Sequence, residues 1–365
     1  MRILKGGALA ALLVTGAAAN AFATPNMIRL GYPTCASCHL SPQGGGVLTT
    51  YGKGIDAAQS LRPEEISETN LTESLRRLAY DMRFSIGFDR DPPAATGYGF
   101  NTSLRSAIGL SGHQKLVYAG SVASPTLTTA RTSGAVTLRM SRLYWMYQPR
   151  QGLSFTVGRD DLPTGLGLPG ATSYTRRVIN PDVSSTPTQA KVFWWNHRWQ
   201  MSAYGFGPDG NETSSRFKAY GAGAIIGADV WKNRAVIGAT TRASYADAYD
   251  RRHIGAFLRL GLSKHWGVLL EHDLTARTTD KGDHLTHVSG HSQVFFVPFD
   301  WLQTALAGEH IRTIDGSYSM RLSPSAQVRL NRNVAVSFNT RDMFTGVASG
   351  RNRTYSLQVM LKTVE

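Results

Sequence analysis

Two cysteines and a histidine in a five-residue run carry the most specific chemistry in this sequence. Cys35, Cys38 and His39 form the pattern Cys-x-x-Cys-His, and no other cysteine occurs among the 365 residues. This pattern is the attachment signature of a c-type haem, in which both thiols bind the porphyrin covalently and the histidine binds the iron. The sequence therefore predicts one covalently attached haem c, with His39 as an axial ligand.

The N-terminus indicates the compartment in which such a haem would be attached. Residues 1–23 contain two basic residues near the start, then an apolar run, and end in Ala-Phe-Ala, which is the layout of a cleaved secretory signal peptide. The apolar run is shorter than the roughly 20 residues of a membrane-spanning helix. We therefore expect an exported protein, which disfavours nucleic acid as a partner.

Three other uses of a cysteine pair compete with haem attachment: a disulfide, a thioredoxin-like redox pair, and half of a zinc site. A thioredoxin-like pair belongs to a βαβ pattern, which this sequence lacks, and a zinc site needs a second pair of cysteines. A disulfide between Cys35 and Cys38 stays open. Because these are the only cysteines of an exported chain, we favour the haem.

The stretch after His39 predicts how the haem is covered. Residues 40–53 contain three consecutive glycines, and glycine lets a backbone approach a planar ligand closely. We expect a loop that folds back over the haem, with Leu48 and Tyr51 on the haem face and Lys53 close to a propionate. An ordinary surface loop is the alternative.

The rest of the chain has the pattern of a β-barrel. From about residue 78 onward, apolar and polar residues alternate in segments of about ten residues, separated by Gly, Asn, Asp and Pro. We count sixteen segments, taking 134–148 as one strand despite a change of phase near Arg142. We therefore predict an all-β fold, a transmembrane antiparallel barrel of about 16 strands in residues 71–365, preceded by a signal peptide in 1–23 and a monohaem cytochrome c-like segment in 24–70.

A soluble β-sandwich or a propeller is the alternative for any alternating pattern. Aromatic residues cluster toward the ends of predicted strands, at 144–147, 193–195 and 295–296, as in the interfacial girdles of membrane barrels. The chain ends without the terminal aromatic residue common in such barrels. The girdles favour the membrane barrel.

The charge fits a barrel with a basic interior. Lys and Arg number 39 against 25 Asp and Glu, a net charge of +14. If the apolar faces meet lipid, the predicted lumen collects the basic residues Arg83, Arg105, Arg139, Lys218, Arg234, Arg242, Arg259, Arg321, Arg329 and Lys362. The acids expected there, Asp81, Glu271, Asp273 and Glu309, are too few to cancel this charge, so the lumen should favour anions. Asp160 and Asp161 are expected in a solvated turn.

No motif fixes the second axial ligand of the haem iron. Met27 precedes Cys35 by eight residues and could return over the ring. His253, His287 and His291 fall on predicted lumen faces and could also complete the coordination. An open position that binds a small molecule is the alternative.

The sequence resembles the fused monohaem cytochrome c-porins of the bacterial outer membrane, a family that includes the outer-membrane iron-oxidising cytochromes. The resemblance rests on Cys35, Cys38, His39, Pro42 and the run Leu48-Thr49-Thr50-Tyr51-Gly52-Lys53 directly after a signal peptide. It covers about residues 24–55, and over the barrel it is architectural. The resemblance implies that Pro42 joins the haem surroundings and that the haem segment plugs the barrel. The triple glycine and the missing terminal aromatic depart from the family pattern.

These observations give three functional hypotheses. The first is an electron conduit in the outer membrane, in which haem c moves electrons between an extracellular donor, for example ferrous iron, or an extracellular acceptor and periplasmic carriers. Such a protein would contact outer-membrane lipid and need no catalytic acid, base or nucleophile, and any oxidase activity would be electron removal at the haem edge. The second is an anion-selective porin with a haem-bearing plug or redox gate. The third is a soluble periplasmic haem protein.

Overall fold

The structure, a computed structural model, describes most of the chain. The described residues are 25–40, 47–59, 61, 79–89, 96–123, 126–128, 131–133, 137–163, 165–166, 186–208, 218–313, 316–331, 333–345 and 351–362. The predicted signal peptide, Pro42 and the triple glycine lie outside them.

Within the described residues, three short helices precede the strands. They are η1 (Pro25–Leu30) and η2 (Cys35–Ser37), both 3-10 helices, and the α-helix α2 (Thr50–Ala58). None of the described helices is long and apolar enough to cross a membrane. Helix α2 corrects the expectation of a loop through Lys53, because Thr49 supplies an N-cap: its Oγ1 accepts a hydrogen bond of 3.1 Å from Gly52 N.

The remaining elements are strands of one antiparallel sheet. They are β1 (Ala79–Asp89), β2 (Thr96–Ser111), β3 (Gln114–Ala123), β4 (Thr126–Thr128), β5 (Arg131–Ser133), β6 (Thr137–Arg150), β7 (Leu153–Arg159), β8 (Thr188–Trp195), β9 (Trp199–Phe206), β10 (Tyr220–Asp229), β11 (Ala235–Ala246), β12 (Tyr249–Gly261), β13 (Trp266–Thr279), β14 (His284–Phe299), β15 (Leu302–Thr313), β16 (Tyr318–Arg329), β17 (Val334–Thr345) and β18 (Arg351–Lys362).

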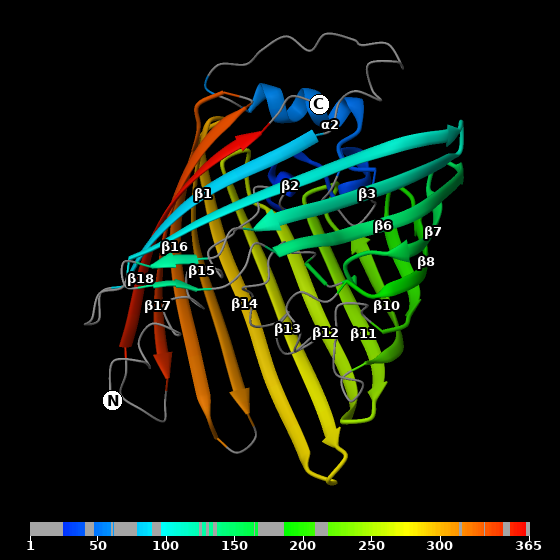
Figure 1. Ribbon diagram of the computed structural model, residues 1–365. Helices are drawn as coiled ribbons and strands as arrows, with labels where there is room; N and C mark the ends of the chain where they lie inside the picture. The colour runs from blue at the N-terminus through cyan, green and yellow to red at the C-terminus, as the bar shows by residue number, and fades with distance from the viewer. Residues whose placement is uncertain are drawn as a thin grey trace.

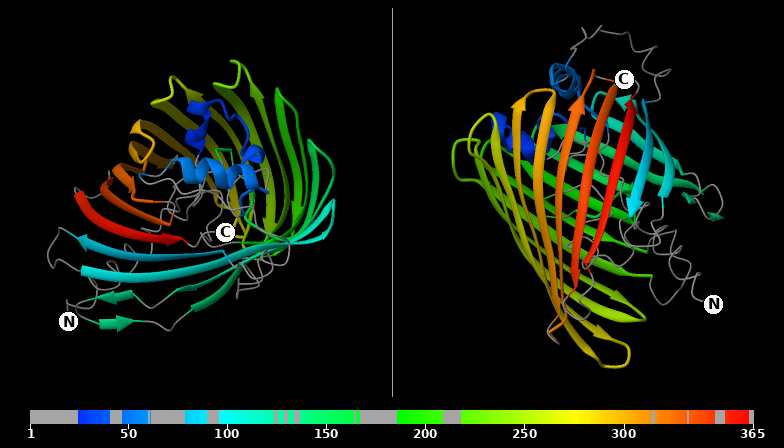
Figure 2. Two further views of the ribbon diagram at one scale, coloured as in Figure 1. Left: turned by 90° about the horizontal axis from the view of Figure 1, so that it is seen from above. Right: turned by 90° about the vertical axis from the view of Figure 1, so that its left-hand side faces the viewer.

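The sheet closes on itself into a barrel (Figures 1 and 2). Strand β1 pairs with β2 on one side and with β18 on the other, so the first and last strands are neighbours. The three-residue strands β4 and β5 are additions beside β2. Among the described residues, the other sixteen strands form the ring, which confirms the predicted fold and strand number.

The change of phase near Arg142 is a β-bulge. Ala119 pairs with Arg142 and the next residue, Gly120, pairs with Met140, so Ser141 has no partner on β3. One extra residue switches which side chains face inward without ending the strand. Counting this segment as one strand is therefore confirmed.

Strand β12 shows the two faces of the wall. Its buried residues alternate with more exposed ones, and the buried set comprises Tyr249, Arg251, His253, Gly255, Phe257, Arg259 and Gly261. The outer face carries Ile254, which is 59% exposed, and other apolar residues. The predicted lumen positions of Arg242, Arg259, Arg321, Glu271, Asp273 and Glu309 are confirmed, since all six side chains are buried on the inner face.

The predicted lumen position is wrong for two residues, Lys218 and Arg234. Lys218 precedes β10 and Arg234 lies in the turn between β10 and β11, and both are exposed. The alternating pattern continues into the residues that precede these strands, but the hydrogen-bonded ladders begin later, at Tyr220 and Ala235. Side chains of Asp81, Arg83, Arg139 and Lys362 lie outside those that the structure describes.

The two ends of the barrel differ. At one end, two-residue hairpin turns such as 112–113, 151–152 and 300–301 join the strands, and we call this the short-turn end. Strand β1 begins and strand β18 ends there. The opposite, long-loop end carries the connection 160–187. Outward aromatic pairs gather toward the short-turn end, for example Trp266 and Phe296, whose ring centroids are 4.4 Å apart. Phe193 and Phe295 of the predicted girdles instead face inward and are buried.

Candidate haem-attachment site

The Cys-x-x-Cys-His run forms a single tight turn. The backbone N–H groups of Cys38 and His39 donate to Cys35 O, at 3.2 and 3.0 Å. Cys38 and His39 are buried, with His39 only 2% exposed, and Cys35 is half-buried. The cysteines are not joined by a disulfide. Two free thiols and an imidazole on one turn are the donor set that covalent haem attachment requires.

The chain after the turn returns alongside it. Leu40 N donates to Val47 O at 3.0 Å, Thr49 N donates to Cys38 O at 2.9 Å, and His39 and Leu48 form a β-bridge. Leu48 is therefore beside His39, the predicted iron ligand.

Gly52 fixes how closely helix α2 lies to the turn. A Cβ atom at this position would be 2.1 Å from Cys38 O, so any side chain would push the helix away. The Thr-x-x-Gly of the sequence thus provides both the helix N-cap and the close contact.

The other predicted haem neighbours lie on α2. Tyr51 is 53% exposed, its ring centroid is 6.0 Å from that of Tyr32, and the two hydroxyls are hydrogen-bonded. This hydrogen bond, with a smaller contribution from burial, raises the pKa of Tyr32 to about 12. Lys53 is half-buried on the same helix.

Helix η1 docks on the inner wall near the short-turn end. Ile28, 1% exposed, packs in a cluster with Phe257, Leu269 and Phe295 of β12 to β14. Gly261 makes room for this helix, since a Cβ there would be 2.5 Å from Ile28 O. Sequence reasoning missed this docking, because the apolar character of Ile28 does not identify its partners.

Arg29 and Met27 connect η1 to other parts of the protein through hydrogen bonds. Arg29 Nη1 donates to Lys264 O at 2.5 Å, and burial lowers the pKa of this guanidinium. Met27 Sδ accepts a hydrogen bond of 3.3 Å from Gln59 Nε2, so Met27 links η1 to the residue after α2.

A second set of contacts reaches other strands. Val47 packs against Val117, Tyr144 and Met146 on β3 and β6. Arg329 of β16 makes an ion pair of 3.1 Å with Asp56 of α2, and its carbonyl accepts a hydrogen bond of 2.9 Å from Leu61 N. The described residues between 25 and 61, called the plug here, are thus attached to several parts of the ring and lie across its opening (Figure 2).

Arg259 joins the plug to a segment inside the barrel, and sequence reasoning placed it only as general lumen charge. Its guanidinium donates to Pro33 O at 3.4 Å and to Gly165 O at 3.3 Å, while it lies 5.1 Å from the centre of the Phe257 ring. Burial raises the pKa of the Cys35 thiol, and the positive charge of Arg259 partly opposes this effect. Burial and the neighbouring Cys35 raise the pKa of Cys38.

The segment after β7 turns into the lumen. Asp160 is buried and forms ion pairs with Arg142 Nε at 3.3 Å and Lys191 Nζ at 2.9 Å, and Asp161 pairs with Arg142 Nη2 at 2.7 Å. These acids are therefore not a solvated turn, because two inward cations hold them against the wall. Further along, Leu166 N donates to Glu271 Oε2 at 3.4 Å.

The three lumen histidines face inward as predicted. His253 contacts Thr275 Oγ1 and Asp273 Oδ1 at 3.3 and 3.4 Å. His291 Nδ1 lies 3.4 Å from Glu309 Oε1, and its Nε2 is buried. His287 is half-buried and lies opposite Thr275 on the neighbouring strand. Within the described residues, no group of three or more His, Cys, Asp or Glu could hold a metal ion.

The fold has known counterparts. An anion-selective porin from Comamonas acidovorans superposes with a TM-score of 0.61 at 11% identity, covering 79% of this chain and 99% of that one. The barrel is porin-like. The loop L8 deletion mutant of OmpT from Vibrio cholerae gives 0.60 at 9% identity over 79% and 98% of the chains, and Pseudomonas putida OprB at high pH gives 0.58 at 10% over 80% and 95%. No family model and no curated protein matches the sequence.

Proposed function

We propose that this chain is an outer-membrane electron-transfer protein that holds one c-type haem at the periplasmic mouth of a porin-like barrel. The observation that carries the proposal is the Cys-x-x-Cys-His turn, buried in a plug that is attached to the inner wall at several strands. A haem there would exchange electrons with periplasmic carriers. On the other side of the membrane, its partner would be an extracellular electron donor, such as ferrous iron, or an electron acceptor.

The barrel itself supports the orientation. Outer-membrane barrels have short periplasmic turns and longer extracellular loops, with both chain ends on the periplasmic side. The plug contacts Gly261, Lys264 and Arg329, which lie at the short-turn end. In this orientation the plug faces the periplasm, where haem is attached to exported chains.

The residues of the plug have separate roles toward the haem. Cys35 and Cys38 would hold the porphyrin through thioethers, and His39 would bind the iron, which when bound supplies one-electron redox chemistry. Gly52 and Thr49 keep α2 against the turn and so fix the position of His39. Arg259 keeps a positive charge beside Cys35, where a propionate could be neutralised.

Among the candidates for the distal ligand, we favour His291. Its Nδ1 lies 3.4 Å from Glu309 Oε1 and its Nε2 is buried, while Met27 Sδ is engaged by Gln59. His291 also pairs across the sheet with Glu271, which holds the inward segment that Arg259 links to the plug. If His291 binds the iron, His291→Ala should convert a low-spin haem spectrum to a high-spin one, and an unchanged spectrum would exclude it.

A second candidate is an anion-selective porin in which the haem-bearing plug serves as a gate. It is supported by the buried arginines of the lumen and by two structural neighbours, one named as an anion-selective porin and one as an outer membrane channel. The likeness to these neighbours is one of fold, and the buried Cys-x-x-Cys-His turn is what favours electron transfer over this candidate.

Two measurements test the proposal on protein purified from outer membranes. A haem stain of the denatured protein and a reduced-minus-oxidised spectrum should show covalent haem in the wild type and lose it in Cys35→Ser. In a planar bilayer, a sealed conduit should pass few ions. Absence of covalent haem in cells that mature other c-type cytochromes would overturn electron transfer, and large anion currents with haem present would favour the gated porin. Recovery in the soluble periplasmic fraction would overturn both.

A further inference from the structure

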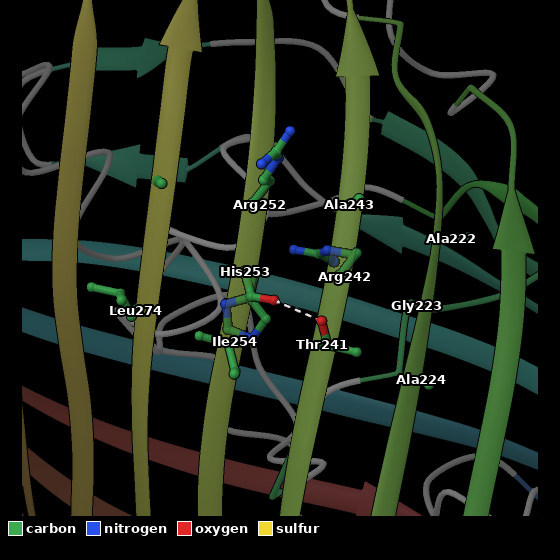
Figure 3. A pocket seen from close by; sticks show the side chains of 11 residues that line it. Ala222, Gly223, Ala224, Thr241, Arg242, Ala243, Arg252, His253, Ile254 and Leu274 are labelled. Atoms are coloured by element: carbon green, nitrogen blue, oxygen red, sulfur yellow. Dashed lines mark hydrogen bonds between the residues drawn. The ribbon is translucent and has the colours of Figure 1, made fainter.

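The outer face of the barrel carries an apolar groove over strands β10 to β13 (Figure 3). Ala222, Ala224, Ala243 and Ala276 form its shallow parts, and Ile254 and Leu274 flank it. The groove has a volume of about 590 Å³ and continues into a second one of about 540 Å³ that also reaches β8 and β9. Together they form an elongated depression in a surface that otherwise meets lipid.

The groove exists because small side chains follow one another across the sheet. Ala222 pairs with Ala243, Ala243 with Arg252, and Arg252 with Ala276. Rows of alanine between larger neighbours leave space that the wall itself does not fill. The hydroxyl of Thr241 donates to His253 O at 3.2 Å, so this polar side chain of the lining is satisfied inside the protein (Figure 3). The groove therefore presents an apolar surface to its occupant.

Arg252 is the exception in this surface. It is exposed on the outer face, between two alanines on the neighbouring strands, and it makes no ion pair or hydrogen bond with other described residues. The acid on the same face of its strand, Asp250, forms no ion pair with it. Arg252 lies three residues from the start of β12, near the long-loop end. A guanidinium at the edge of an apolar surface is costly in a membrane unless an anion or the headgroup region meets it.

We propose that this groove binds a phosphate-bearing lipid of the outer leaflet, with an acyl chain along the alanines and a phosphate on Arg252. The proposal rests on the outer-membrane placement and orientation given above, in which the long-loop end is extracellular. Charge complementarity selects the headgroup, since guanidinium and phosphate form strong bidentate hydrogen bonds. The lipid that carries such phosphates in the outer leaflet is lipopolysaccharide.

The test uses the full-length haem-loaded protein in detergent, with lipopolysaccharide and its dephosphorylated form as probes. Binding is followed by native mass spectrometry. We expect the wild type to bind the phosphorylated form about tenfold more tightly than the dephosphorylated one, and Arg252→Gln to abolish this preference. Ala224→Leu, which fills the groove, should weaken binding of both forms. Arg234→Gln removes the same charge at the short-turn end and should change nothing.

Several results would overturn the proposal. One is equal binding of the two lipids by the wild type, and another is a preference that survives Arg252→Gln. If Ala224→Leu changes the oligomeric state instead of lipid binding, the groove is a contact between copies. A haem stain and a heat-modifiable gel shift on each variant report the haem and the folded barrel, so a failure of the proposed function is distinguished from a failure of lipid binding.

Discussion

Gly52 affects the position of the Cys-x-x-Cys-His turn most directly, because only a residue without a side chain fits there. The space at its α-carbon is taken by Cys38 O, which also accepts a hydrogen bond from Thr49 N. Two contacts on the same carbonyl define where the backbone between Cys38 and His39 lies. Position 52 therefore affects the geometry of the predicted attachment turn although it offers no ligand.

Gly52→Ala should displace α2 from the turn, because the added methyl would overlap Cys38 O. Overpacking of this kind costs about 1–3 kcal/mol. We expect less covalent haem per barrel, measured by haem stain against total protein. Gly109→Ala is the matched control, since nothing lies within 4 Å of a Cβ there. Equal haem in both variants would contradict the role given to Gly52.

The thiols of the haem-free protein should react slowly at neutral pH. Burial raises the pKa of Cys35 and Cys38, and the thiolate is the reactive form, so the folded protein holds less thiolate than an unfolded chain at the same pH. Alkylation by iodoacetamide should therefore rise at a higher pH in the folded protein than in urea. Coincident pH profiles in the two states would contradict the burial of the thiols.

At the scale of the elements, the plug depends on strand β12. Its inner face offers Gly261 to η1, Arg259 to the chain before Cys35, and Phe257 to the apolar cluster around Ile28. Alternate residues of one strand thus provide space, charge and apolar contact along a single line. The same strand carries Arg252 and Ile254 on the lipid side.

Arg259→Gln should loosen the plug. The substitution removes hydrogen bonds from a charged donor to Pro33 O and Gly165 O, and such bonds contribute about 1.5–3 kcal/mol each at good geometry. We expect faster cleavage of the plug by added protease in the purified protein. Arg252→Gln is the control on the opposite face of the same strand. An unchanged cleavage rate in Arg259→Gln would show that the apolar contacts of Ile28 suffice.

At the scale of the whole molecule, a closed ring and a separately docked plug coexist. The ring closes through the backbone ladder between β1 and β18, in which residue 81 lies opposite residue 362. This ladder involves no residue of the plug. The plug contacts the ring near the short-turn end, but its described residues supply none of the strands that form the ring. The barrel is therefore expected to fold with or without the plug in place.

Removing the plug should open the pore. A variant that joins the predicted signal peptide to residue 62 keeps every described strand and leaves the buried arginines of the lumen, which attract anions. We expect higher conductance in a planar bilayer, with a reversal potential that indicates anion selectivity. Arg242→Gln in this variant should reduce the selectivity. Conductance equal to that of the intact chain would show that the plug does not limit the pore.

The sequence by itself determined the features that depend on neighbouring residues. The period of two gave the sixteen strands and the lumen faces of His253 and His291, because side chains alternate across a strand wherever it lies. The five-residue motif placed Cys35, Cys38 and His39 together, since one turn contains all three. The predicted strand borders were wrong at Lys218 and Arg234, because the alternation extends beyond the ends of the strands.

Only the tertiary structure decided where the Cys-x-x-Cys-His turn lies. Arg259 donates to Pro33 O across 226 residues of sequence, and Gly261 receives η1, contacts that no local pattern encodes. They arise because ring closure brings distant strands to one mouth and leaves an apolar patch on the inner wall there. The inward course of Asp160 and Asp161 has the same origin, since the cations that hold them lie on β6 and β8.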